Sequence, residues 1–455
     1  MMNIVSAIAE IVGPQGLLTG KDVSNRPNHS AWTGSCPAKA IVRPASTEEL
    51  SQVMTLCYQQ SQSMVPWGGM SGLVDGITCS ADDIAISLER IAAIEHIDSD
   101  AGIIRVQAGA ILEKIQKAAE ETGWLFAVDL GARGSATIGG MISTNAGGNS
   151  VIRYGMMREQ ILGLEVVLAD GTVISSMNEM LKNNAGYDLK QLFIGSEGTL
   201  GIVTRAVLRL RPEPCAVQTA LVALNNFADA VSLLRHLGRA FDGKLSAFEV
   251  MWRKHYQYMV EDAGKHQAFL PTIYPYYVLL ESAGADAERE EQQFTQVLGD
   301  LLEQGAVADA VIAQSGQQAA QLWAMRDDVG LFFTTMGPLA VFDISLPVRE
   351  MEAYVQGVEQ QLKQQFPQAR LITFGHLGDG NIHLVIGPAH DKQAVESIVY
   401  ERLVQVGGSI SAEHGIGLQK RSYLPHSRSC AEIQLMKTLK SALDPKHLLN
   451  PGKIF

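Results

Sequence analysis

Residues 129–148, DLGARGSATIGGMISTNAGG, form the stretch that decides the fold of this chain. Glycines occur there in pairs and at short intervals, with Ser135 and Thr137 between them. The stretch predicts a long irregular loop, because glycine adopts backbone conformations that other residues avoid. Backbone N–H groups and hydroxyls presented by such a loop can bind the phosphates of a nucleotide.

Two further glycine-rich loops lie on either side of this stretch. Residues 66–72, PWGGMSG, follow an expected strand, and residues 195–203, GSEGTLGIV, run into another. None of the three loops fits G-x-G-x-x-G between a strand and a helix, so a Rossmann site is not indicated. Each glycine pair alone is most simply a structural turn. Together, the loops indicate a large nucleotide cofactor.

Short strands and helices surround these loops in the first half of the chain. We expect helices over residues 4–12 and 111–123, and one from Ser46 that opens with a capping box to Glu49. Strands are expected at residues 40–44, 64–67, 83–88, 102–109 and 202–212. Residues 164–176 predict a hairpin with Asp170-Gly171 as its turn.

The second half of the chain alternates longer strands with amphipathic helices. Strands are expected at residues 216–224, 246–252, 274–282 and 339–347, and near residue 308. Helices are expected around residues 226–239 and 287–303, and again after residue 431. This order predicts an α+β domain with a ferredoxin-like, mainly antiparallel sheet.

Residues 375–383, GHLGDGNIH, combine a turn signal with two histidines. If Asp379-Gly380 is a two-residue turn, His376 and His383 face each other directly across the hairpin. Directly opposed Cβ atoms lie ~4.5–5.5 Å apart, which lets two imidazoles reach one divalent metal. The spacing alone leaves open a core hairpin whose histidines make ordinary hydrogen bonds.

Residues 411–417, SAEHGIG, place Glu413 next to His414. Neighbouring residues on an extended chain point to opposite sides, so the two suit different tasks unless a loop aims both at one site. The Gly-x-Gly that follows favours a loop. On the residues alone, a solvated turn is the alternative.

In sequence and order, the three glycine loops resemble the FAD domain of the vanillyl-alcohol oxidase/p-cresol methylhydroxylase (PCMH) superfamily over roughly residues 31–212. The resemblance implies an N-terminal helix and linker over residues 1–30, then a PCMH-type FAD-binding domain of two subdomains. It implies a ferredoxin-like substrate and metal domain over residues 213–425 and a helical tail over 426–455 that returns to the flavin. The implied FAD contacts are Pro66, Gly68, Gly69, Met70, Ser71, Gly72, Leu73, Asp129, Ser135, Thr137, Gly140, Ile142, Asn145, Gly147, Glu197, Gly198, Ile202 and Asn450.

We predict noncovalent FAD. Some relatives attach the flavin through a His or Cys, but residues 66–76 contain neither. His96 is the next His along the chain, and it matches no attachment motif.

The motifs GHLGDGNIH and SAEHGIG resemble the paired motifs of metal-dependent D-2-hydroxyacid dehydrogenases, in the same order. The resemblance makes His376, His383 and Glu413 the ligands of a divalent metal, expected to be Zn²⁺, with Mn²⁺ or Fe²⁺ as alternatives. It makes His414 the general base that takes the proton of a C2 hydroxyl before hydride passes to the flavin. Arg326 matches the family arginine that binds the substrate carboxylate, and a surface position on a helix is the alternative.

Two positions depart from the D-2-hydroxyglutarate dehydrogenases, whose wording the first domain most resembles. Val341 stands where those enzymes carry Lys, and Val385 where they carry Asn. Burying a second carboxylate without partners is costly. We therefore expect a monocarboxylate such as D-lactate, with D-2-hydroxyglutarate and glycolate as alternatives. Two other functions remain as alternatives. One is a PCMH-type transferase or sugar oxidase, and the other is a non-catalytic flavin electron-transfer subunit.

Bulk composition excludes several other classes. The 455 residues include 46% apolar and 18% charged residues, enough for a sizeable core. With a net charge of −12 and no long basic run, nucleic acid is not an expected partner. No apolar run suits a transmembrane segment, the N-terminus does not look like a signal peptide, and the five scattered Cys form no CxxC pair.

These features predict a cytoplasmic enzyme, with attachment at the inner face of a membrane as an alternative. The lack of a CxxC pair and of a nicotinamide fingerprint predicts an external electron acceptor: a quinone, a cytochrome or an electron-transfer flavoprotein. The resemblance makes a homodimer an open expectation.

Overall fold

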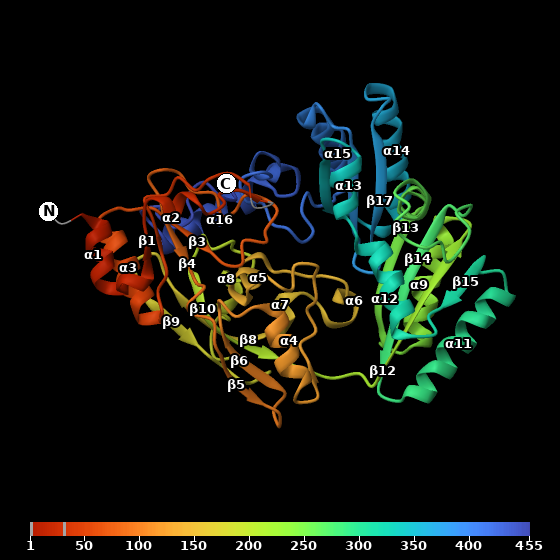
Figure 1. Ribbon diagram of the computed structural model, residues 1–455, viewed down its shortest axis with the longest axis horizontal. Helices are drawn as coiled ribbons and strands as arrows, with labels where there is room; N and C mark the ends of the chain where they lie inside the picture. The colour runs from red at the N-terminus through yellow and green to blue at the C-terminus, as the bar shows by residue number, and fades with distance from the viewer. Residues whose placement is uncertain (1–2, 31–32) are drawn as a thin grey trace. The chain divides into compact units, whose positions relative to one another are not determined.

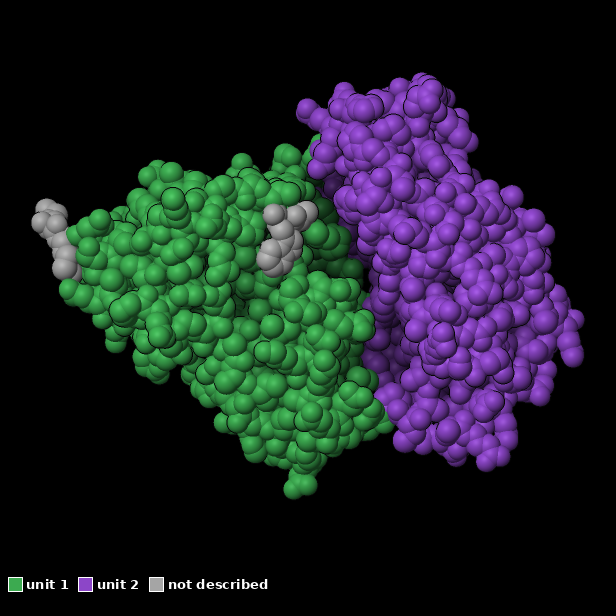
Figure 2. All heavy atoms as spheres, in the orientation of Figure 1, with its two compact units in different colours: residues 1–148, 155–213, 413–455 green, residues 149–154, 214–412 purple. Residues whose placement is uncertain are grey.

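The computed structural model describes residues 3–30 and 33–455, so the expected domain start at residue 31 lies outside the described residues. Two compact units are present (Figures 1 and 2). Unit 1 comprises residues 1–148, 155–213 and 413–455, and unit 2 comprises residues 149–154 and 214–412. The chain therefore crosses between the units more than once, and the segment from Glu413 onward belongs to unit 1.

The elements follow in chain order, with η marking 3-10 and π turns. Those of unit 1 are α1 (Ile4–Val12), η1 (Pro14–Gly16), β1 (Leu17–Leu18), α2 (Lys21–Ser24), β2 (Ala40–Val42), α3 (Thr47–Gln59), β3 (Met64–Trp67), β4 (Ile84–Ser87), β5 (Ile94–Asp98), β6 (Ile103–Gln107), α4 (Leu112–Glu120), β7 (Trp124–Leu125), α5 (Ile138–Thr144), α7 (Met157–Gln160), β8 (Ile161–Val167), β9 (Val173–Ser176), α8 (Lys190–Phe193), β10 (Ile202–Arg209), β11 (Arg211–Pro212), η5 (Arg421–His426) and α16 (Cys430–Leu443). Those of unit 2 are α6 (Val151–Tyr154), β12 (Ala216–Leu224), α9 (Phe227–Ala240), β13 (Leu245–Trp252), α10 (Arg253–Gln257), η3 (Tyr258–Asp262), β14 (Tyr276–Gly284), α11 (Ala287–Glu303), β15 (Asp309–Ile312), α12 (Gly316–Asp327), α13 (Gly330–Thr335), β16 (Ala340–Ser345), η4 (Val348–Glu350), α14 (Met351–Gln365), β17 (Arg370–His376), β18 (Asn381–Gly387) and α15 (Lys392–Gln405).

Unit 1 is built on two main sheets that share one apolar core. The smaller sheet has the order β1-β2-β4-β3, and β2, β4 and β3 run parallel. The larger has the order β5-β6-β10-β8-β9 and is antiparallel throughout. Buried side chains from strands of both sheets pack in a single cluster with those of α3, α4 and α5. This matches the two subdomains expected for the first domain.

Local sequence patterns in unit 1 predicted its first helix, a helix cap and a hairpin. Helix α1 spans the expected residues, and Ser46 caps α3 by accepting a hydrogen bond from the Glu49 backbone N–H at 3.2 Å. The capping box is incomplete, because the Glu49 carboxylate accepts from the N–H of Ala45, at 2.8 Å, and not from that of Ser46. The 164–176 hairpin forms, with Leu164 opposite Ser176, but its turn is longer than two residues because β8 ends at Val167 and β9 begins at Val173.

Unit 2 contains one seven-stranded sheet of order β15-β12-β14-β13-β17-β18-β16, with every neighbouring pair antiparallel. The expected α+β class and antiparallel sheet are confirmed. Strands β13, β17, β18 and β16 lie side by side, so β13 and β16 flank the β17–β18 hairpin in one sheet.

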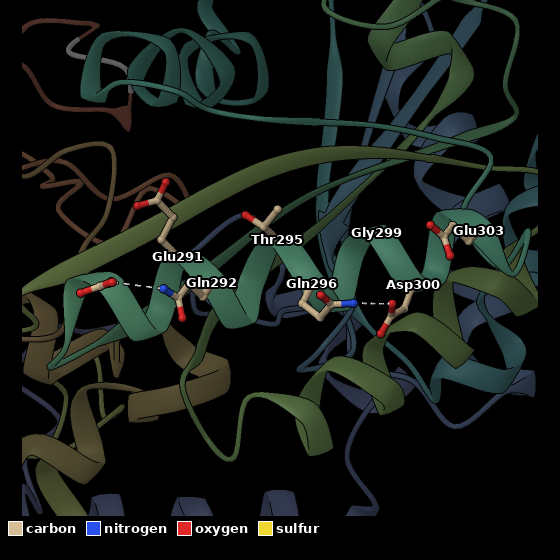
Figure 3. Close-up of a pocket in the computed structure, with 8 residues that line it drawn as sticks. Glu291, Gln292, Thr295, Gln296, Gly299, Asp300 and Glu303 are labelled. Carbon is tan, nitrogen blue, oxygen red and sulfur yellow. Dashed lines mark hydrogen bonds between the residues drawn. The ribbon is translucent and has the colours of Figure 1, made fainter.

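Helix α11 shows how the helices of unit 2 cover this sheet. Phe294, Leu298 and Leu301 are buried on its inner side, as a 3.6-residue period requires. Its outer side is polar (Figure 3), and the Gln296 side-chain amide donates to Asp300 at 2.7 Å. The hollow along this side has only residues of α11 in its lining, and none of the predicted site residues is among them. No helix in the described part of the chain is both long and apolar enough to cross a membrane.

Candidate active site

The first two glycine loops of unit 1 pack directly against each other. The Gly69 N–H donates to Thr137 Oγ1 at 3.1 Å. A Cβ on Gly69 would lie 1.9 Å from the carbonyl oxygen of Ser135, and one on Gly68 would lie 2.6 Å from Thr137 Oγ1. Because the clash at Gly69 involves backbone, no side chain fits there without moving the second loop. These glycines are thus required for loop–loop packing.

The third loop joins the other two through strained backbone. Glu197 has φ +51°, and its N–H donates to the Ser143 carbonyl oxygen at 2.7 Å. A Cβ on Gly198 would lie 2.6 Å from Pro66 Cγ in the first loop. Non-glycine residues at positive φ cluster at functional sites. The structure therefore brings the three predicted loops together within unit 1.

The remaining predicted FAD residues have varied surroundings. Ile142 and Ile202 are buried in the core. The Asp129 carboxylate already accepts from Gln116 at 3.1 Å and from Arg133 at 2.8 Å. Gly72 has no atom within 4 Å of where its Cβ would be. Met70, Ser71, Leu73 and Gly147 lie in irregular segments. Gly140 lies within α5, which interrupts the loop expected over residues 129–148, and Asn145, at φ +51°, ends this helix. Direct contact with FAD stays a prediction for each.

Asn450, from the C-terminal tail, meets the third loop. Its side-chain N–H donates to the Glu197 carbonyl oxygen at 2.8 Å, and its own backbone N–H donates to the Met64 carbonyl oxygen. Asn450 Oδ1 is buried and has no hydrogen-bond partner among the described residues. A buried acceptor of this kind needs a donor. FAD carries N–H and hydroxyl donors, so this orphaned oxygen fits a flavin held by the loops.

Glu197 also anchors the SAEHGIG loop. Its carboxylate accepts hydrogen bonds from the backbone N–H groups of Ile416 and Gly417, each at 2.7 Å. Burial raises the pKa of Glu197, and these two donors oppose the rise. Glu413, in the same loop, accepts from the N–H of Gly148 at 2.8 Å. Both glutamates therefore link the SAEHGIG loop to the glycine loops.

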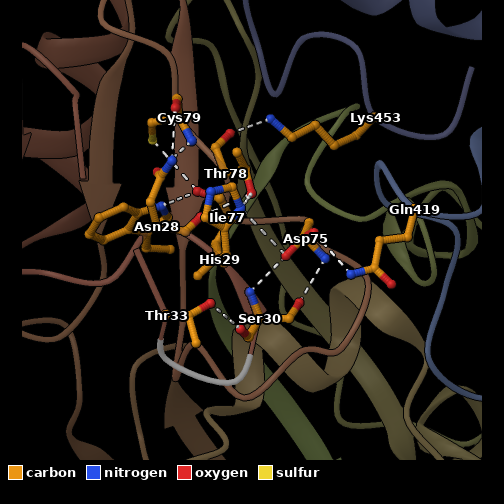
Figure 4. A network of polar contacts seen from close by, with 11 residues as sticks. Asn28, His29, Ser30, Thr33, Asp75, Ile77, Thr78, Cys79, Gln419 and Lys453 are labelled. Atoms are coloured by element: carbon orange, nitrogen blue, oxygen red, sulfur yellow. Dashed lines mark hydrogen bonds and ion pairs between the residues drawn. The ribbon is translucent and has the colours of Figure 1, made fainter. Parts of the chain in front are cut away.

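A polar network holds the chain just after the first loop (Figure 4). The Ser30 N–H donates to Asp75 Oδ1 at 2.7 Å, and the Gln419 side chain donates to Asp75 Oδ2 at 2.9 Å. Lys453 Nζ donates to the Thr78 carbonyl oxygen at 2.7 Å. Since Gln419 and Lys453 follow the SAEHGIG loop, this network is a second link between the tail and the FAD region of unit 1.

The histidine hairpin of unit 2 has a different register from the one expected. Phe374, not His376, is the partner of His383. Strand β17 ends at His376 and β18 begins at Asn381, so the turn holds four residues and not the two of Asp379-Gly380. The cause is local, because the Asp379 carboxylate accepts from the Asn381 N–H at 3.1 Å and closes the wider turn. The direct opposition of His376 and His383 was therefore wrong.

The two histidines nevertheless meet on one face of the sheet. A shift by two residues keeps the side-chain face unchanged. The His376 and His383 ring centroids lie 5.3 Å apart at an interplanar angle of 82°. The two imidazoles can therefore bind one metal ion together. Glu413, the third predicted ligand, belongs to unit 1, so its part in this site stays a prediction.

Each histidine has a buried carboxylate on the strand next to its own. Glu249 on β13 is the register partner of His376, and its Oε1 lies 2.6 Å from His376 Nδ1. Asp343 on β16 is the register partner of His383, and its Oδ1 lies 3.9 Å from His383 Nδ1. Metal-binding histidines commonly donate their second N–H to a carboxylate in this way. The donor set and its surroundings thus fit a divalent metal.

Arg326 is buried and not on the helix surface. Its guanidinium contacts Glu249 Oε2 through Nε at 2.9 Å and through Nη2 at 2.7 Å, and Asp327 through Nη1 at 3.0 Å. Nη2 also lies 3.3 Å from His376 Nε2. Burial alone would raise the pKa of Glu249, but Arg326 and His376 outweigh it and lower that pKa to about 2. Glu249 is therefore anionic at neutral pH.

The sequence-based prediction did not include Glu249 or Asp343. Both stand alone as charged residues in strands that are otherwise apolar, within SAFEVMW and LAVFDISLP. A charged residue in a strand buried on both faces is rarely left without a partner. That signal could have identified them, although not their partners, which depend on strand order.

Two residues beyond His383 along β18, the same face of the sheet carries apolar side chains. Val341 and Val385 are register partners, two residues along from Asp343 and His383. Val385 is buried in one cluster with Ile372, Phe374 and Phe332, whereas Val341 is 42% exposed. The positions that depart from the D-2-hydroxyglutarate dehydrogenase pattern therefore lie beside the histidines, on their face.

His255 is buried within this apolar surround and is not solvated. Both its ring nitrogens have no hydrogen-bond partner among the described residues, and its ring lies 4.6 Å from that of Phe374. Burial, together with the charges of Arg326 and His266, lowers the pKa of His255 from 6.5 to about 3. As pH falls below 6.5, the unfolded chain binds the proton first. The contribution of His255 to folding stability is therefore lost from about pH 6.5 towards pH 3.

Replacing His255 by Leu is expected to remove this pH dependence. Between pH 6 and 4.5 the unfolding free energy of the wild type should fall relative to the variant by about 1.4 kcal/mol per pH unit. Urea unfolding at several pH values measures the difference. His236→Leu, at an exposed position of α9, is the matched control and should keep the wild-type slope. Parallel wild-type and H255L curves would contradict the assignment.

Comparison with known families covers nearly the whole chain. The family description "FAD linked oxidases, C-terminal domain" matches residues 213–454, and "FAD binding domain" matches residues 38–176. Among solved structures, 4-ethylphenol oxidase from Gulosibacter chungangensis has a TM-score of 0.76 at 15% identity, covering 99% of this chain and 96% of the other. An alkyldihydroxyacetonephosphate synthase also has a TM-score of 0.76, at 18% identity, covering 98% and 84%. At these identities the likeness shows the fold.

Curated relatives are more similar in sequence. A D-2-hydroxyglutarate dehydrogenase of Xanthomonas citri pv. viticola is 40% identical over 447 residues, 96% of this chain and 92% of that protein. A probable mitochondrial D-2-hydroxyglutarate dehydrogenase of Oryza sativa subsp. indica is 37% identical, covering 99% and 81%. A putative mitochondrial D-lactate dehydrogenase of Schizosaccharomyces pombe is 34% identical, covering 99% and 89%.

Proposed function

Because this chain belongs to the FAD-linked oxidases and is an FAD-dependent D-2-hydroxyacid dehydrogenase, we propose that its substrate is a D-2-hydroxymonocarboxylate such as D-lactate, which it converts to the 2-oxoacid. The observation that carries the proposal is one sheet face of unit 2. There His376 and His383 are followed directly by the Val341–Val385 pair. Two imidazoles suit a metal, and two valines suit a small apolar substituent at C2.

The cofactor assignment relies on the three glycine loops and Asn450. When bound, FAD supplies the acceptor for the two electrons that leave the substrate carbon. The loops offer backbone N–H groups, and Asn450 Oδ1 offers a buried acceptor that lacks a donor. We propose noncovalent binding, so acid precipitation should release all the flavin into the supernatant. Yellow colour in the washed pellet would contradict this.

We propose His376, His383 and Glu413 as the ligands of a divalent metal, because their motifs match the family pattern and the two histidines share one sheet face. When bound, a divalent ion, in our proposal Zn²⁺, supplies the Lewis acid that lowers the pKa of a C2 hydroxyl. Two imidazoles and one carboxylate are typical of catalytic zinc, which keeps a position open for substrate. His414, next to Glu413 in sequence, would take the hydroxyl proton, since imidazole is the most common general base in enzymes.

Arg326 would bind the substrate carboxylate. A guanidinium presents five N–H donors in a fixed plane, and the substrate carboxylate would share them with Glu249 and Asp327, which Arg326 already contacts. Its Nη2 is 3.3 Å from His376 Nε2, which places the arginine beside a proposed metal ligand. A 2-hydroxyacid carries its carboxylate and hydroxyl on adjacent carbons, so neighbouring arginine and metal sites match its shape.

D-2-Hydroxyglutarate is the second candidate substrate, because most of the similar relatives carry that name. Its second carboxylate would need a cationic or amide partner, and Val341 and Val385 offer neither. An unpaired buried carboxylate is costly. We therefore place D-lactate first. The reduced flavin would pass its electrons to an external acceptor such as a quinone, a cytochrome or an electron-transfer flavoprotein.

A substrate panel with an artificial electron acceptor tests the proposal. We expect kcat/KM for D-lactate to exceed that for D-2-hydroxyglutarate by roughly tenfold or more, since leaving one charge unpaired costs at least ~1.4 kcal/mol. A chelator should abolish both activities while the flavin stays bound, and added Zn²⁺ should restore them. A preference for D-2-hydroxyglutarate would establish the second candidate. Full turnover after metal removal would exclude the metal role.

A further inference from the structure

Glu249 contacts both His376 and Arg326 through its carboxylate. It lies on β13, the strand next to β17, and is only 1% exposed. Its Oε1 faces His376 Nδ1 at 2.6 Å, and its Oε2 accepts from the Nε and Nη2 of Arg326 at 2.9 and 2.7 Å. One buried group thus contacts a proposed metal ligand and the proposed carboxylate-binding residue.

The two carboxylate oxygens of Glu249 constrain different partners: Oε1 faces His376, and Oε2 faces Arg326. A carboxylate is only an acceptor, so His376 must carry its proton on Nδ1. The lone pair of His376 then lies on Nε2, which faces Arg326 Nη2 at 3.3 Å and would bind the metal in place of that contact. On the other side, the contacts with Nε and Nη2 fix the plane of the Arg326 guanidinium.

We propose that Glu249 is a positioning residue that sets both the tautomer of His376 and the orientation of Arg326, and so aligns metal binding with carboxylate binding. This rests on the proposed function for the roles of His376 and Arg326. Glu249 itself touches neither metal nor substrate. It acts through its two partners.

Asp343 provides an internal comparison. It lies beside His383 on the other side of the hairpin, and it accepts from the side chain of Asn381 at 2.9 Å. Asp343 and Arg326 face different histidines, since Asp343 Oδ1 lies 3.9 Å from His383 Nδ1 and Arg326 Nη2 lies 3.3 Å from His376 Nε2. Loss of the Asp343 charge should therefore weaken metal binding only, whereas loss of the Glu249 charge should affect both metal and substrate.

Glu249→Gln is the decisive variant, because a glutamine of equal size has one acceptor oxygen and one donor NH₂. Whichever way it turns, a donor faces either His376 or Arg326. We expect Co²⁺ to bind the chelator-treated holoenzyme roughly 10–100-fold more weakly in E249Q. At saturating metal, the KM for D-lactate should also rise roughly tenfold or more. In D343N the Co²⁺ affinity should fall while this KM stays near the wild-type value.

Glu290→Gln is the matched control. Glu290 is also a buried glutamate of unit 2, paired with Lys244 at 2.8 Å, and it contacts neither Arg326 nor His376. E290Q should therefore keep wild-type Co²⁺ affinity and KM. If E249Q does not fold, E249Q/R326Q removes both charges of the pair, and it should show the same loss of Co²⁺ affinity.

The outcomes separate this inference from the proposed function. If wild-type protein reduces its flavin with D-lactate but E249Q binds Co²⁺ and D-lactate as the wild type does, the positioning role is wrong. If no 2-hydroxyacid of the panel reduces the wild-type flavin, the proposed function fails. In that case Co²⁺ binding alone decides whether Glu249 sets the tautomer of His376.

Discussion

His383→Gln is expected to lower kcat for D-lactate by about 10³-fold, because a lost Lewis acid removes several kcal/mol of transition-state stabilisation. The ring centroid of His383 lies 5.3 Å from that of His376, and Asp343 Oδ1 lies 3.9 Å from His383 Nδ1. Glutamine fills similar space but is a poor metal ligand. The variant should retain FAD, since every residue predicted to contact FAD belongs to unit 1. Turnover with an artificial acceptor and the absorbance of bound flavin give the two measurements.

His390→Gln is the control for this prediction. His390 is exposed, lies just beyond the same hairpin, and is part of no group that could hold a metal among the described residues. Its replacement should leave both turnover and metal content unchanged. A His383→Gln enzyme that turns over at more than a tenth of the wild-type rate would show that the hairpin does not hold a catalytic metal.

Local sequence patterns predicted much of unit 1. The helix that begins after Ser46 and the glycine loops depend on contacts within or between short segments. Serine caps the N-terminus of a helix, and glycine allows close approach of two backbones, so the residue types there indicate the local structure. Gly69 illustrates this, since its missing side chain is what lets the first and second loops touch. The prediction could not show that Glu197 anchors Ile416 and Gly417, which lie more than two hundred positions further along the chain.

The hairpin shows where a local rule failed. Asp-Gly is a strong signal for a two-residue turn. Here the Asp379 side chain accepts from the Asn381 N–H, and the turn widens to four residues. The prediction that His376 and His383 share one sheet face was still correct, because a two-residue shift of register preserves side-chain direction. The two histidines therefore lie close together as expected, while their direct opposition was wrong.

Strand order is what the sequence patterns could not supply. Glu249 precedes His376 by 127 positions, and the two become neighbours only because β13 pairs with β17. Asp343 meets His383 because β16 lies on the other side of the hairpin. Long-range pairings of this kind leave only a weak trace in sequence, namely a single charged residue inside an apolar strand.

Lys440→Met is expected to cost about 3–5 kcal/mol of unfolding free energy, the usual result of breaking a buried ion pair from one side. Lys440 is 4% exposed, and its Nζ donates to Asp444 Oδ2, at 2.6 Å, and to the carbonyl oxygens of Thr199 and Leu449. Burial lowers the pKa of Lys440, and the Asp444 charge opposes that shift. Without Lys440, Asp444 remains as an anion in the core, and the two carbonyl oxygens lose their donor.

The effect should extend to the cofactor. Thr199 belongs to the third glycine loop, and Leu449 directly precedes Asn450, so Lys440 ties the tail to that loop. We therefore expect K440M to lose FAD during gel filtration as well as to unfold at lower urea. Lys437→Met, an exposed lysine on the same helix, should change stability by no more than ~0.5 kcal/mol.

Adding Asp444→Asn to K440M removes the stranded charge. It keeps an acceptor for only one of the two backbone N–H groups, those of Leu448 and Leu449, that donate to the Asp444 oxygens. The double variant should therefore regain part of the lost stability, because the charge that made the single replacement costly is gone. It should not regain FAD, because Thr199 and Leu449 still lack the donor that joins them. Recovery of both properties together would mean that charge burial alone, and not this bridge, accounts for the loss.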